Sequence, residues 1–315
     1  MGHSPAMIAD VALSTLSAFS PEDIVRALRH LPAAPKVLPR LKQLLGERQG
    51  EMAEIVALIR LDPGIAVRVL QVANSAYFSK GVRCATVEEA VQWVGYDEVY
   101  DLVAYAVSSQ VLIRSLDVYG IDADTLWTQA VACALAAEIL AQRTGQDANV
   151  AYTIGLLHGV GMVAIDEWAL YHAPALTLRH AGFPREATEA ERAAFGFTQA
   201  EVGAALLRQW NFPPAMSEPL RWQYAPRASA GQARMAALLL AAKWLRTAVC
   251  TEPLACPAPP EALQLQWLGL SPAELPDLVA EVAQQLAAVG SLLEVAAPGQ
   301  RGRNHFPVQD GGARG

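Results

Sequence analysis

Apolar residues recur along most of this chain at spacings of three and four positions, which is the pattern of amphipathic helices. In the first third of the chain the pattern predicts one helix that begins near Pro21 and further helices over 37–45, 51–60, 63–75, 86–94 and 97–112. Further along it predicts helices over 121–144, 149–157, 163–168, 174–180, 184–194, 198–210, 213–224, 228–250, 261–268 and 271–286. Because no alternating strand pattern competes with these helices, the sequence predicts an all-α fold.

Residues that favour helix ends support these boundaries. Asp62 and Pro63 form a helix start, since Asp accepts hydrogen bonds from free N–H groups and Pro fits the first helical position. Asn74 and Ser75 lie near the end of the same helix, where Asn74 can bind free carbonyl groups and the small Ser75 permits a close helix crossing. Gly95 closes the following helix. These residues predict a tight helical corner and so a structural role.

Composition and charge exclude several classes of protein. Apolar residues make up 53% of the chain and charged residues 17%, so the chain buries a large core. A formal net charge of −7 argues against a protein that mainly binds nucleic acid. A local basic surface of Arg60, Arg68, Lys80 and Arg83 is the remaining route to such binding.

Nothing in the pattern indicates a secreted or membrane-spanning protein. The first twenty residues lack a basic start followed by a continuous apolar stretch, and apolar runs are interrupted before about 18 residues. The four cysteines show no CxxC pair. We therefore expect a cytoplasmic protein without a membrane span.

The segment 153–162 reads Thr-Ile-Gly-Leu-Leu-His-Gly-Val-Gly-Met and stands out for its lone histidine. An isolated histidine after two leucines is typical of a core residue with a satisfied ring. Gly155 precedes it on the same predicted helix, and Gly159 and Gly161 predict a sharp turn after it.

The same segment resembles the Gly-Leu-Leu-His-Asp-x-Gly segment of the HD phosphohydrolase superfamily, in which the adjacent His and Asp hold a metal. Three further blocks, at 31–35, 61–78 and 86–95, follow one another at close spacing and resemble the HDOD family, the HD-related output domain of bacterial signalling proteins. The resemblance covers about residues 22–225.

This resemblance implies a division of the chain. It places an N-terminal bundle of short helices at about 22–112, packed on a degenerate HD-like helical part at about 113–225. A C-terminal helical extension is expected over 226–296, after a weakly ordered segment over 1–20 and before a disordered tail over 297–315.

The resemblance also implies where metal ligands would stand, and the sequence departs from that pattern. Gln129 stands where relatives commonly carry His, and Gly159 replaces the Asp after His158. Gln199 follows Thr198 where an Asp-His pair is expected, and Trp222 and Gln223 replace a His pair. Since glutamine is a poor ligand for transition metals, we expect no metal, no cofactor and no catalytic residues.

The leading hypothesis is a non-catalytic signalling or regulatory module that binds another signalling protein in trans, with cyclic-di-GMP-linked signalling as a candidate setting. One alternative is a small-ligand or nucleotide sensor whose pocket would be lined by Gln129, His158, Gln199, Trp222 and Gln223. Another is a divergent metal-dependent phosphohydrolase. The sequence leaves open whether the protein forms homo-oligomers.

Overall fold

The computed structural model describes residues 19–27, 52–75, 83–95, 99, 115–178, 185–229, 231–250 and 258–295. Every regular element that these residues form is a helix, and their one extended pairing is an isolated antiparallel bridge between Leu116 and Ile121. The predicted all-α fold is therefore confirmed. The helices predicted over 37–45 and 97–112 lie outside the described residues except for Val99, as do the segments 1–18 and 296–315.

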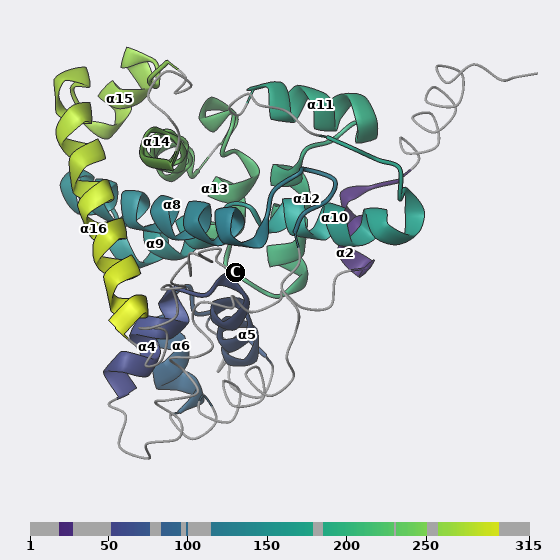
Figure 1. Ribbon diagram of the computed structural model, residues 1–315, viewed down its shortest axis with the longest axis horizontal. Helices are drawn as coiled ribbons and strands as arrows, with labels where there is room; N and C mark the ends of the chain where they lie inside the picture. The colour runs from purple at the N-terminus through teal and green to yellow at the C-terminus, as the bar shows by residue number, and fades with distance from the viewer. Residues whose placement is uncertain are drawn as a thin grey trace, which may run out of the picture.

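Three short helices form an N-terminal part at the lower side of Figure 1: α4 (Met52–Arg60), α5 (Pro63–Ala73) and α6 (Val87–Val94). Two of these helices begin where a side chain just before the helix bonds a backbone N–H of its first turn. Asp62 Oδ1 accepts a hydrogen bond from Ile65 N at 3.0 Å, and Thr86 Oγ1 accepts one from Glu89 N at 3.1 Å. Gly95 ends α6 with φ 93°, a conformation that favours glycine.

Asn74 fixes the corner between α5 and α6. Its Nδ2 donates to the carbonyl of Cys84 at 3.0 Å, and its Oδ1 accepts from the Cys84 N–H at 2.9 Å. The side chain therefore binds the loop before α6 rather than the carbonyls of its own helix. Ser75 is half-buried beside it and donates its N–H to the Val72 carbonyl at 3.1 Å.

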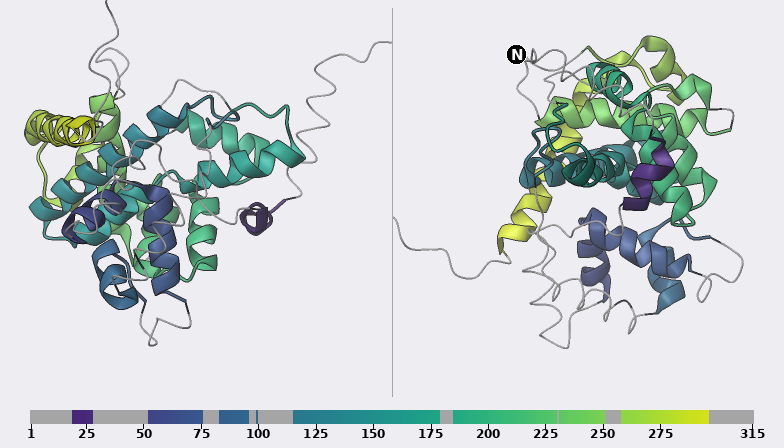
Figure 2. Two further views of the ribbon diagram at one scale, coloured as in Figure 1. Left: turned by 60° about the horizontal axis from the view of Figure 1, so that its bottom comes forward. Right: turned by 90° about the vertical axis from the view of Figure 1, so that its right-hand side faces the viewer.

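The HD-like part is built around a long helix, α8 (Ala123–Thr144), which packs against α9 (Ala148–Leu157). It continues through α10 (Val160–His172), α11 (Arg185–Phe195), α12 (Gln199–Gln209) and α13 (Pro214–Arg221). The N-terminal helix α2 (Pro21–Ala27), purple in Figure 2, packs on α10 and α12 rather than on α4–α6.

The helices after residue 225 are in part integral to this core. After the short 3-10 turn η1 (Pro226–Ala228), α14 (Ala233–Cys250) packs against α8, α9 and α13. The 3-10 turn η3 (Pro272–Glu274) links α15 (Ala262–Leu268) to α16 (Leu275–Val295), which lies along one side against α8 and α14 (Figure 1, yellow). The predicted boundary at 225/226 thus falls between two helices that contact each other.

Three predicted elements differ from the structure. Residues 174–178 form a turn and irregular backbone instead of a helix, because the Leu178 N–H donates to the Val118 carbonyl at 2.6 Å, a distant partner that local pattern cannot show. Helix α10 starts at Val160, so Gly161 lies inside the helix and not in the turn, which consists of His158 and Gly159. Helix α16 continues past the predicted end at 286 to Val295.

Within the described residues, the stretch Ala148–His172 is long and apolar enough to cross a membrane by length and composition. Of its most apolar window, 72% is buried inside the protein, as is usual for core helices.

Two glycines allow helix backbones to touch. A Cβ atom on Gly155 would lie 2.8 Å from both Ala134 Cα and the Cys133 carbonyl oxygen on α8. A Cβ atom on Gly161 would lie 1.9 Å from the Gln199 carbonyl oxygen on α12. Backbone atoms cannot move aside as a side-chain tip can, so both contacts require glycine.

We expect Gly161→Ala to lower the free energy of unfolding by about 3 kcal/mol, because the added methyl forces α10 and α12 apart. The matched control is Gly159→Ala, whose Cβ would meet only the mobile end of Met162, at 3.0 Å, and should change stability by less than about 1 kcal/mol. Urea denaturation of the two variants measures the difference. Equal stability of the two variants would contradict the close contact.

Candidate functional site

His158 lies in the turn between α9 and α10, and its side chain is 3% exposed. Its Nδ1 is 2.8 Å from the Gly155 carbonyl oxygen, which can only accept, so Nδ1 carries the proton. Its Nε2 is 2.9 Å from Arg246 Nη1 and therefore accepts from the guanidinium. Burial, reinforced by the nearby cations Arg246 and Lys243, holds the pKa of His158 well below its usual range. The ring is thus neutral, with one tautomer fixed.

Gln223 follows α13 and is fully buried. Its Nε2 donates to the carbonyls of Leu220 at 3.0 Å and of His158 at 3.2 Å. Its Oε1 accepts from Lys243 Nζ at 2.7 Å. All three contacts of the amide are therefore made inside the protein, and they join α13 to both α9 and α14.

Lys243 comes from α14 and is only 2% exposed. Besides Gln223, its Nζ lies 3.3 Å from the centre of the Tyr224 ring, a cation–π contact. Burial, followed by repulsion from Arg246, lowers the pKa of Lys243 well below its usual value. The buried ammonium is held by an amide oxygen and an aromatic face.

Gln199 extends the cluster toward the other side of the HD-like part. Its Nε2 donates to Tyr224 Oη at 2.7 Å, and its backbone N–H donates to Glu191 Oε2 at 2.8 Å. Glu191 in turn accepts from Tyr119 Oη at 3.1 Å. A continuous set of contacts therefore runs from Tyr119 through Gln199 to Lys243.

The structure thus brings together three of the predicted site residues, namely His158, Gln199 and Gln223. Trp222 is directed elsewhere, since its Nε1 donates to Glu218 at 3.2 Å on its own helix. Gln129 is half-buried on α8, and none of the hydrogen bonds between described residues joins it to His158. Gly159 lies in the turn directly after His158, without a side chain to add.

Sequence reasoning missed the residues that complete the cluster, Lys243 and Arg246 above all. The available signal was Lys243 and Arg246, two basic residues three positions apart in the mostly apolar helix 233–250. Such a spacing places both side chains on one face, and a buried helix has to provide partners for them. Glu191, a charged residue of the predicted helix 184–194, also joins the cluster and is 1% exposed.

These residues do not fit a divalent metal. The lone pair of His158 Nε2 is bonded by Arg246, and the amide oxygen of Gln223 is bonded by Lys243, so both acceptor atoms face basic side chains. Within the described part of the chain, no three His, Cys, Asp or Glu side chains gather closely enough to hold a metal ion.

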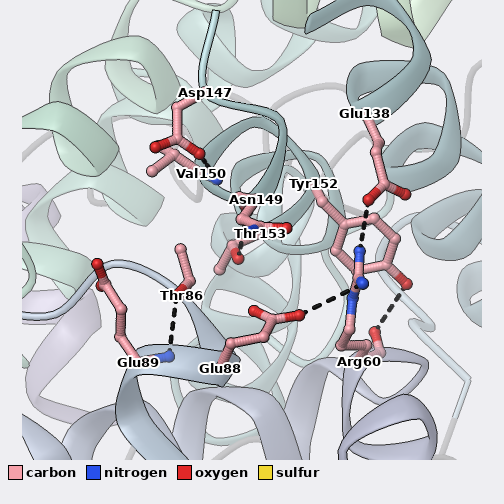
Figure 3. Close-up of polar contacts among 10 residues, drawn as sticks. All are labelled: Arg60, Thr86, Glu88, Glu89, Glu138, Asp147, Asn149, Val150, Tyr152 and Thr153. Atoms are coloured by element: carbon pink, nitrogen blue, oxygen red, sulfur yellow. Dashed lines mark hydrogen bonds and ion pairs between the residues drawn. The ribbon is translucent and has the colours of Figure 1, made fainter. Parts of the chain in front are cut away.

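The basic residues considered for nucleic-acid binding are partly engaged. Arg60 lies between Glu88 and Glu138, with N–O distances of 3.3 and 2.8 Å (Figure 3). Arg83 donates to the Phe212 carbonyl at 3.4 Å, Arg68 is half-buried, and Lys80 lies outside the described residues. Arg60 therefore presents no isolated positive charge to a phosphate.

A comparison with known protein families finds a match over more than half of this chain. A family model described as the HDOD domain matches residues 31–226. An uncharacterized protein from Treponema pallidum (strain Nichols) is 30% identical over 198 residues, which are 62% of this chain and 37% of that protein. The chain therefore spans little more than a third of the length of this relative.

Solved structures share the fold. The MmoQ response regulator from Methylococcus capsulatus strain Bath is 21% identical with a TM-score of 0.66, over 80% of this chain and 99% of that chain. A virulence factor from Campylobacter jejuni subsp. jejuni is 16% identical with a TM-score of 0.59, over 85% of this chain and all of the other.

Glu191 is the residue of this cluster from which we expect a pH dependence of stability. Burial raises the pKa of Glu191 from an ordinary 4.5 to about 7, although the hydrogen bonds from Gln199 N–H and Tyr119 Oη offset part of this rise. A raised folded-state pKa stabilises the fold below pH 4.5, and that contribution is lost as the pH rises through about 7.

We expect the wild-type protein to lose up to about 3 kcal/mol more stability between pH 4.5 and 8 than Glu191→Gln, which cannot ionise. Unfolding by urea at several pH values measures this difference. Glu189→Gln, an exposed change on the same helix, is the control and should follow the wild type. Parallel curves for wild type and Glu191→Gln would show that Glu191 does not titrate in this range.

Proposed function

The chain belongs to the HDOD domain family, and from that premise we propose that it is a non-catalytic signalling module that acts by binding another protein in trans. One observation carries the proposal: the Nε2 atom of His158, the atom that would face a metal, accepts a hydrogen bond from Arg246 at 2.9 Å. Hydrolysis in the HD superfamily depends on divalent metals that activate water and neutralise phosphate.

The electrostatics of the cluster support this proposal. A divalent ion placed at His158 would lie beside the guanidinium of Arg246 and close to Lys243, two groups whose charge repels it. A metal could enter only by displacing the Arg246 hydrogen bond, and a single imidazole would then be its one ligand from the predicted set. Such a site binds metal weakly.

The contacts of His158 and Gln223 favour a binding module over a ligand sensor. The buried side chains of His158 and Gln223 use their polar atoms on Arg246, Lys243 and backbone carbonyls, so these atoms are not available to a ligand. A partner protein needs only the outer surface of the helical fold. The finer form of the proposal, a role in cyclic-di-GMP-linked signalling, follows from the family resemblance.

The first test measures metal and turnover together. Protein purified without chelator should contain well under one Fe, Mn, Ni or Zn per chain by mass spectrometry, and should not hydrolyse phosphodiesters when Mn²⁺ or Ni²⁺ is added. Stoichiometric metal, with turnover that disappears in His158→Ala, would establish an enzyme instead.

A second test separates signalling from catalysis in the host cell. The variant His158→Gln keeps an acceptor for Arg246 but removes the imidazole. A strain lacking the gene and complemented with this variant should behave like one complemented with the wild type, because the proposed module needs the fold and not the imidazole. Failure of a stably folded His158→Gln protein to complement would contradict the proposal.

A further inference from the structure

The N-terminal part meets the HD-like part at the short connection between α4 and α5, and also at Arg83, which donates to the Phe212 carbonyl at 3.4 Å. Two buried aromatic side chains of the HD-like part donate to backbone carbonyls of this connection. Tyr152 Oη on α9 donates to the Arg60 carbonyl at 3.0 Å, and Trp127 Nε1 on α8 donates to the Leu61 carbonyl at 2.9 Å. These bonds fix the position of the connection, whatever side chain stands at position 60.

The side chain of Arg60 adds a second set of contacts at the same corner. Its Nη2 donates to Glu138 Oε1 on α8 at 2.8 Å, and its Nη1 is 3.3 Å from Glu88 Oε1 on α6. Its guanidinium also lies over the Tyr152 ring, 4.1 Å from the ring centre. Figure 3 shows Arg60 between the two carboxylates, which come from the two different parts of the chain.

The two sets of contacts differ in how easily they can be broken. The side chains of Trp127 and Tyr152 are buried, and the hydrogen bond of Trp127 is buried with its side chain, whereas that of Tyr152 is partly buried. The side chains of Glu88 and Glu138 are 32% and 19% exposed, and that of Arg60 is 25% exposed. Ion pairs that water reaches are weak and are screened by salt.

We propose that the Arg60 corner is a latch: the bonds of Trp127 and Tyr152 form a pivot, and the Arg60–Glu138 ion pair holds the N-terminal part in one orientation until it is broken. Helices α4, α5 and α6 pack on one another, and they share an apolar core with α8 and α9. The proposed motion is a turn of these three helices together about the pivot, against that shared core. In Figures 1 and 2 they form a separate group of helices beside α8 and α9. This inference stands on the corner alone and does not depend on whether the His158 site holds a metal.

The two carboxylates provide a matched pair of variants. Glu138→Gln removes the ion pair that crosses between the two parts, whereas Glu88→Gln removes the one that stays within the N-terminal part. Both remove one negative charge at similar exposure. A general effect of charge or stability would therefore appear in both variants, and a latch only in Glu138→Gln.

The experiment measures the distance between spin labels on the exposed positions Gln92 of α6 and Gln142 of α8, each replaced by Cys in the full chain with Cys250→Ser and Cys256→Ser. Electron–electron double resonance should give one narrow distance peak for the labelled parent and for Glu88→Gln. Glu138→Gln should raise the population outside that peak about threefold, and 1 M NaCl should do the same to the parent.

Two results would overturn the latch. Unchanged distances in Glu138→Gln and at high salt would mean that apolar packing alone sets the orientation. Equal broadening in Glu88→Gln and Glu138→Gln would mean that the ion pair crossing between the parts has no special role. Neither result bears on metal content or turnover, so the latch and the proposed function can fail separately.

Discussion

Backbone contact between helices at two glycines is the constraint on which the rest of this structure depends. Gly155 lets α9 touch α8, and Gly161 lets α10 touch α12, with no room for a methyl group at either position. His158 lies between these two glycines in the chain and is 3% exposed. An imidazole buried to this extent must have its two ring nitrogens bonded by the protein itself, because water cannot reach them.

The protein meets this requirement with two cationic side chains from α14. Arg246 bonds the histidine, and Lys243 bonds Gln223, which in turn bonds the His158 carbonyl. The acceptor atoms of His158, after α9, and Gln223, after α13, are thus both bonded by side chains of α14. A bound metal ion would join ligands from different helices in a similar way. The arrangement keeps Lys243 buried, and this burial lowers the pKa of its ammonium.

Local features of the fold could be predicted from the sequence, and long-range ones could not. Asp62, Thr86 and Asp122 cap the helices that the pattern predicted, because a cap depends only on residues three positions away. The family resemblance implied that His158, Gln199 and Gln223 share a site. In the structure Gln223 bonds the His158 carbonyl, and Gln199 is linked to them through Tyr224 and Lys243. The bond of Arg246 to a residue 88 positions away left no local signal beyond a charge on an apolar helix.

The buried cluster of Lys243 and Arg246 and the partly exposed cluster around Arg60 differ in how easily their contacts can be changed. A metal ion can leave its ligands, whereas Lys243 and Arg246 are covalently part of the chain, so the core of the site offers no exchangeable group. Arg60 differs, since its carboxylate partners are reached by water and by approaching charges. A fold of this kind would keep a fixed core and place its adjustable contacts at the boundary between its two parts, where the charged side chains are partly exposed.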